Sequence, residues 1–152
     1  MSYTNKEGRA QILEDMGAAI KALDVALAEL GEAYEHLDEQ AAERLEDGVF
    51  KPLQGACGLL KRSQAEFALR CSASVVSDLA PAARPAPESP GIALENAAEA
   101  ISEADQLISE LQDSMLPVEV GDQELRAGLS AVRGQLTPLP AACDELVRTL
   151  GR

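Results

Sequence analysis

Residues 13–41, LEDMGAAIKALDVALAELGEAYEHLDEQA, contain the pattern that decides the fold. Their apolar side chains recur at alternating spacings of three and four residues, which places them along one face of a helix. The row consists of Leu13, Met16, Ile20, Leu23, Leu27, Leu30, Tyr34, Leu37 and Ala41. Because an apolar face of this length has to be covered by other helices, the stretch predicts one member of a multi-helix assembly.

Three further stretches share this periodicity, and no stretch alternates as a β-strand would. Their rows are Phe50, Leu53, Cys57, Leu60, Gln64, Phe67, Cys71, Val75 and Leu79; then Leu94, Ala97, Ile101, Ala104, Ile108, Leu111 and Met115; then Leu125, Leu129, Val132, Leu136, Leu139, Cys143, Leu146 and Leu150. Aromatic residues make up only 3% of the chain, which favours close helix packing over a sheet core. We therefore predict an all-α fold, with residues 1–152 forming a single helical domain.

The expected helices span about residues 5–47, 50–80, 92–115 and 122–150. Gly48 offers a left-handed residue to end the first helix, and Pro52 fits the first turn of the second. One long helix kinked at Pro52 is the alternative. In the last helix, Thr137 and Pro138 predict a kink without a chain reversal, because the apolar row keeps its phase across them.

The segment 80–91, APAARPAPESPG, has four prolines and reads as an extended, semi-rigid linker. Fully extended, it could reach roughly 35–40 Å, enough to cross the end of a bundle or to run along its side. We predict an up-down-up-down four-helix bundle, in which the linker joins two helical hairpins. Residues 13–30 resemble residues 94–111 at an offset of 81, which raises the hypothesis that the two hairpins arose by duplication.

The formal net charge is −13, and the acidic groups concentrate in the first and third predicted helices. An up-down-up-down bundle would place these two helices on a diagonal, where their mutual repulsion is weakest. A field of this sign repels phosphate backbones and anionic membranes, so we expect no nucleic-acid or membrane partner. The N-terminal residues have neither a basic region nor an apolar core of the kind found in signal peptides, which favours a cytoplasmic protein, although export without a cleavable signal stays open.

Few residues of the chain are of the kinds that act as nucleophiles or bind metal ions. The one histidine, His36, follows Ala33 by three residues, so the Glu-x-x-His pattern of carboxylate-bridged metal sites is missing. Cys57, Cys71 and Cys143 lie on apolar rows and are expected to be buried thiols. We therefore predict no catalytic residue, no metal site and no cofactor.

The leading hypothesis is a non-enzymatic helical interaction or scaffold protein that self-associates or binds a protein partner. The candidate partner-binding surface is the acidic back of the first helix, formed by Glu32, Glu35, His36, Glu39 and Glu43. Two alternatives remain: an acidic bundle that binds a metal ion or small ligand, and an acidic mimic that captures a basic, nucleic-acid-binding protein.

Overall fold

The computed structural model describes residues 5–73 and 82–150, which fold into helices with no strand among them. The helices are α1 (Asn5–Glu35), α2 (Glu39–Leu45), a π-helix η1 (Glu46–Phe50), α3 (Lys51–Arg70), α4 (Pro90–Asp113), α5 (Leu116–Val120), α6 (Gln123–Leu136) and α7 (Leu139–Leu150). The all-α prediction is confirmed. None of the described helices combines the length and the apolar character that a membrane crossing requires.

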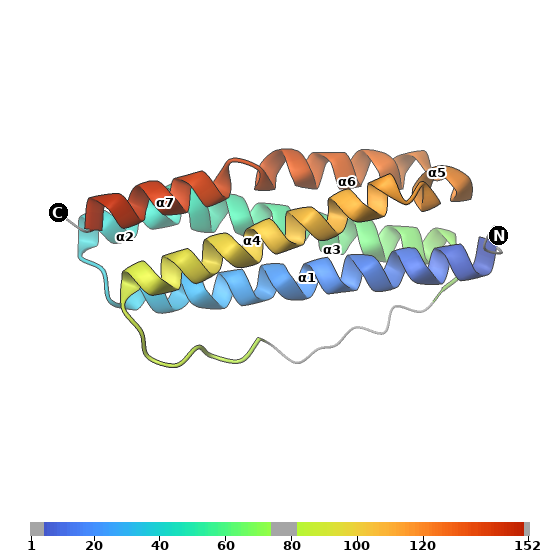
Figure 1. Ribbon diagram of the computed structural model, residues 1–152. Coiled ribbons are helices and arrows are strands. Elements are labelled where there is room, and N and C mark those ends of the chain that lie inside the picture. Colours follow the sequence, from blue (N-terminus) through green and yellow to red (C-terminus); the bar gives the residue numbers. More distant parts are fainter. Residues whose placement is uncertain (1–4, 74–81, 151–152) are drawn as a thin grey trace.

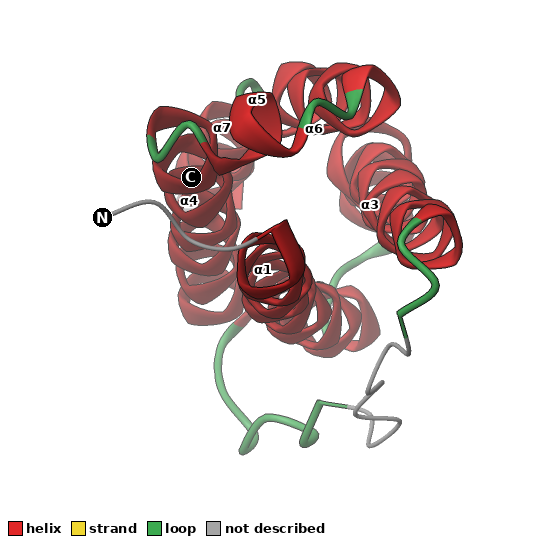
Figure 2. Cartoon of the chain, turned by 90° about the vertical axis from the view of Figure 1, so that its right-hand side faces the viewer, coloured by secondary structure: helices red, strands yellow, loops and turns green. Residues whose placement is uncertain are grey.

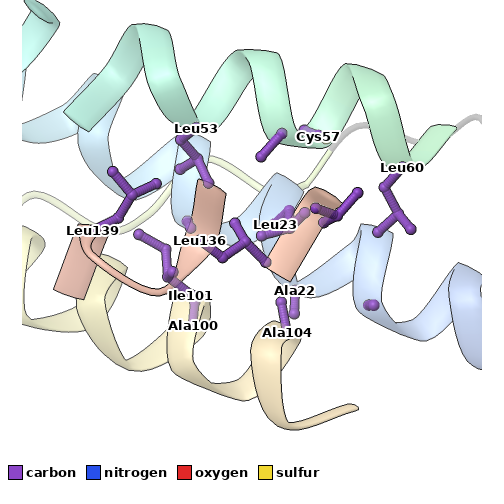
Figure 3. Close-up of a cluster of buried hydrophobic side chains, with 14 of the residues drawn as sticks. Ala22, Leu23, Leu53, Cys57, Leu60, Ala100, Ile101, Ala104, Leu136 and Leu139 are labelled. Carbon is purple, nitrogen blue, oxygen red and sulfur yellow. The ribbon is translucent and has the colours of Figure 1, made fainter. Parts of the chain in front are cut away.

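The long helices lie side by side around one aliphatic core (Figures 1 and 2). Helix α1 packs against α4 and α3, α4 packs against α7 and α6, and α3 packs against α6. In Figure 3, Leu23 of α1, Leu53 of α3 and Ile101 of α4 lie together with Leu136 of α6 in one cluster. All four of these side chains are fully buried. The core therefore draws side chains from every long helix.

The order of helix directions differs from the prediction. The start of α1 lies beside α5, because Gly8 is close to Val120. It also lies near the end of α3, because Arg9 is close enough to Cys71 for its charge to lower the pKa of that thiol. At the other end of the molecule, Glu29 of α1 contacts Glu88, which precedes α4. Helices α3 and α4 therefore run in the same direction, as Figure 1 shows. The predicted up-down-up-down order is wrong.

The predicted diagonal placement of the two acidic helices is also wrong, because α1 packs directly against α4. Small side chains allow this approach, since both facing surfaces are rich in buried alanine. These residues are Ala19, Ala22, Ala26 and Ala33 on α1, and Ala93, Ala97, Ala100 and Ala104 on α4.

The chain first turns earlier than predicted, at residues 36–38 instead of at Gly48. Asp38 caps α2 by accepting a 2.8 Å hydrogen bond from the Ala41 amide. From Glu39 the chain stays helical to Arg70, passing through Gly48 and Pro52. The π-helix directly before Pro52 widens the backbone there, which accommodates a ring that would otherwise clash with the preceding turn. The predicted boundary between 47 and 50 is therefore wrong.

The buried face of α1 keeps Met16, Leu23 and Leu30 of the predicted row, but at the alternate positions it is shifted by one residue toward the N-terminus. Ile12 and Ala26 are fully buried, whereas Leu13 and Leu27 only pack against the edge of the core. Tyr34, assigned to the row, is 47% exposed. The later rows fare better, because every predicted position from Leu125 to Leu146 is buried. Cys57 and Cys143 are buried as expected, and Cys71 is partly exposed.

The remaining helix boundaries differ from the prediction at two places and agree with it at a third. Helix α3 ends at Arg70, not near residue 80, and Val75 and Leu79 lie outside the described residues. Ser89 caps α4, which begins at Pro90, two residues before the predicted start. The interruption between α6 and α7 leaves the direction of the chain unchanged, so the predicted kink without reversal is confirmed (Figure 1).

Candidate functional site

Three of the five predicted surface residues gather at the C-terminal end of α1. One ligand-type atom from each of Glu32, Glu35 and His36 lies within 4.8 Å of the others. Glu35 and His36 are exposed, as expected for a surface site. Glu32 is only 5% exposed, so it supports this cluster from beneath and does not form part of the outer surface.

The buried Glu32 carboxylate has a partner at each oxygen. Its Oε1 lies 3.1 Å from Nε2 of His36, the first residue after α1. Its Oε2 lies 3.7 Å from Nε of Arg84, which comes from the segment before α4. A buried carboxylate is costly unless it is paired, so these two contacts explain how α1 tolerates it.

Arg84 ties the segment before α4 to the end of α1. Besides its contact with Glu32, its Nη2 donates a 2.8 Å hydrogen bond to Glu35 Oε2. A cation bound between the two carboxylates would therefore compete with a guanidinium that already neutralises them. The sequence analysis did not find this role, because 49 positions separate Arg84 from Glu35.

The other two predicted residues, Glu39 and Glu43, lie on α2, beyond the turn at residues 36–38. Both are exposed. Next to them is a shallow, open surface depression lined by Gln40, Glu43, Arg44, Asp47 and Gly48. The predicted acidic back of one helix is thus two neighbouring acidic surfaces, one at the end of α1 and one on α2.

A second carboxyl pair, which the sequence analysis missed, lies one turn before Glu32. Glu29 on α1 is hydrogen-bonded to Glu88, and Glu88 Oε2 accepts a 3.2 Å hydrogen bond from Asn96 Nδ2 on α4. Burial raises the pKa of Glu29 to about 7, and the hydrogen bond to Glu88 and the charge of Glu88 add to this effect. No local spacing points to this pair, because Glu29 and Glu88 are 59 positions apart in the sequence.

The cysteines lie in surroundings that suppress thiolate formation. Burial raises the pKa of Cys57 to about 11 and that of Cys143 to about 12. The Cys57 sulfur donates a 3.7 Å hydrogen bond to Asp24, which also binds Lys61 at 3.3 Å. Since the thiolate is the nucleophile in cysteine chemistry, this arrangement does not activate Cys57.

Comparison of the chain with protein-family models, curated proteins and solved structures gave no match.

Proposed function

We propose that this chain is a non-enzymatic helical interaction or scaffold protein that self-associates or binds a protein partner in the cytoplasm. Its framework would be a four-helix bundle, in which α6 and α7 count as one interrupted helix. The role follows from how the polar groups are distributed between interior and surface.

The observation that carries the proposal is the polar content of the interior. Within residues 5–73 and 82–150, the polar residues that are buried as a whole are Glu32 and Ser63. His36 and Arg84 already bind Glu32, and Ser63 lies where α3 and α6 approach closely at Gly128. These groups serve packing and ion pairing, which leaves the surface as the part of the molecule suited to recognition.

The surface that we assign to a partner consists of Glu35, His36, Glu39 and Glu43. Beneath it, the buried Glu32 binds His36, and Arg84 binds Glu35. The exposed carboxylates favour a basic partner surface, since complementary charge speeds association and selects the partner. A second copy of this acidic chain would have to use an apolar contact instead. Tyr34, beside Glu35, is a large exposed side chain suited to that purpose.

Two measurements test the proposal. Light scattering at high protein concentration gives the mass, and a value well above the 16.0 kDa of one chain would support self-association. Capture from extracts of the native host, at low and at high salt, tests whether the chain binds a protein partner. We expect a protein that is retained at low salt and released at high salt. A monomer that captures nothing at either salt concentration would contradict the proposed function.

A further inference from the structure

Two carboxyl groups from distant parts of the chain meet where the segment 82–89 approaches α1. Glu29 Oε2 and Glu88 Oε1 are both buried, and no hydrogen-bond donor from the described residues reaches either of them. The other Glu88 oxygen already accepts a hydrogen bond from Asn96. Because the two carboxyl groups lie within hydrogen-bonding reach of each other, one shared proton would give these oxygens a donor and remove one of two neighbouring negative charges.

We propose that the Glu29–Glu88 pair is a proton-dependent latch, in which one shared proton holds the segment 82–89 against α1 and its loss releases Glu88. The segment has two described side-chain attachments to α1, the Arg84 ion pairs and the Glu88 carboxyl. Arg84 keeps its charge at any accessible pH, so Glu88 is the attachment that protons can control.

The groups that face Glu29 from each neighbouring element favour the protonated state. Helix α1 contributes the Glu32 carboxylate, the segment before α4 contributes Glu88, and α4 contributes the uncharged amide of Asn96. The Asn96 amide lowers the pKa of Glu29, but burial and the two carboxylates outweigh it. Arg84 and His36 bind Glu32, not Glu29, so they soften the repulsion without supplying a donor to the pair.

The direction of the pH effect follows from the raised pKa. Between the ordinary value of 4.5 and about 7, the folded chain keeps a proton that the unfolded chain has lost. The pair therefore makes its full contribution to the free energy of unfolding below pH 4.5, and this contribution decreases as the pH rises from 4.5 to about 7. The latch should be closed in mildly acidic solution and open in mildly alkaline solution.

The test is an NMR titration of the full chain that follows the Glu29 side-chain carboxyl carbon and the backbone amides of Ala86 and Glu88. In the wild type, we expect both amides to shift together with the Glu29 carboxyl, with a midpoint near 7. In Glu29→Gln, the amide side chain can donate to Glu88 at every pH, so the shift of the two backbone amides near neutrality should vanish.

Two control variants separate the latch from other charge changes. Glu95→Gln removes an exposed carboxylate of α4 and should leave the titration unchanged. His36→Gln removes the one imidazole of the chain, and the midpoint should again persist. A Glu29 carboxyl that titrates near 4.5 in the wild type would overturn the proposal, whether or not the variants fold. The proposal would also be overturned if the pH-dependent shifts of the Ala86 and Glu88 amides disappeared in His36→Gln and persisted in Glu29→Gln.

Discussion

Asp122 stabilises two parts of the structure with one carboxylate. Its Oδ1 accepts a 2.8 Å hydrogen bond from the Leu125 amide and thereby caps α6. Arg70, at the end of α3, donates to both carboxylate oxygens at 2.8 and 2.9 Å. Burial alone would raise the pKa of Asp122, but the hydrogen bonds from Arg70 and the Leu125 amide outweigh it, so the pKa lies below 3.8.

Replacing Asp122 should therefore destabilise the fold. We expect Asp122→Ala to lower the free energy of unfolding at neutral pH by about 1–3 kcal/mol, since a cap and a charged hydrogen bond are lost together. Because the folded pKa is depressed, this contribution is present above 3.8 and disappears as the pH falls through the folded value. Urea unfolding at neutral and acidic pH measures it. Asp144→Ala, at an exposed position of α7, is the control and should have little effect.

Gly128 lies where α6 comes closest to α3. A methyl group added at this glycine would lie 2.6 Å from Ser63 Oγ and 3.3 Å from Ser63 Cβ. Gly134, six residues further along the same helix, has no atom within 4 Å of an added methyl group. The two glycines thus share a helix and differ in the room around them.

This contrast gives a matched pair of variants. Gly134→Ala should stabilise the chain by up to about 1 kcal/mol through helix propensity, and Gly128→Ala should gain less than this or lose stability. Adding Ser63→Ala to Gly128→Ala should recover part of the difference, because the hydroxyl is removed. Thermal unfolding of the four proteins checks this order, and equal stability of the two glycine variants would contradict the close approach.

At the residue scale, the sequence predicted groups whose partners lie nearby in the chain. The last helix was predicted to begin at about residue 122, and Asp122 caps it, three residues before the amide it binds. The burial of Glu32 was not predicted, because it depends on Arg84, which is 52 positions away. Local hydrogen bonding follows from spacing alone, whereas ion pairs between distant segments depend on the tertiary fold.

At the scale of the elements, Gly48 shows how a plausible boundary signal can mislead. Glycine after a run of helical residues often ends a helix in the left-handed region. Here Gly48 lies inside the π-helix, and its φ is not positive. The turn occurs instead at residues 36–38, where Asp38 supplies a side-chain cap for α2. A capping aspartate and a glycine were both present, and the choice between them depended on packing.

The variant Gly48→Ala separates the two interpretations. Within a continuous helix and with no atom within 4 Å of the new methyl group, alanine should stabilise the chain by roughly 0.5–1 kcal/mol. A left-handed glycine that ends a helix would instead make the same substitution destabilising by a similar amount. Chemical unfolding of the wild type and of Gly48→Ala shows whether the substitution raises or lowers the free energy of unfolding.

The shift of the buried face of α1 has a similar origin. The predicted row consists mainly of large apolar residues such as leucine and isoleucine, whereas several of the buried positions on α1 are alanines. Ala19, Ala26 and Ala33 are fully buried against neighbouring helices. In helices that pack closely, the smallest side chains mark the interface better than the largest ones. The row in α6 and α7 was placed correctly, because large residues occupy its buried positions.

At the scale of the whole molecule, charge was given too much weight in the sequence analysis. Repulsion between α1 and α4 suggested a diagonal arrangement, yet most of their carboxylates point outward, where solvent and salt screen them. The linker estimate already allowed the observed order. A 24-residue helix such as α4 is about 36 Å long, close to the reach of an extended segment 80–91. Alanine-rich faces on both acidic helices were the signal that favoured direct contact.

The central claim is that the exposed carboxylates of α2, beside the end of α1, bind a basic protein surface. Glu39→Gln with Glu43→Gln removes two exposed charges one turn apart, and Glu99→Gln with Glu103→Gln removes a matched pair from α4. The most direct measurement is the amount of partner that each protein captures from host extract at low salt. We predict that the α2 variant captures several-fold less than the wild type, while the α4 variant captures the same amount. Equal capture by all three proteins would contradict the claim.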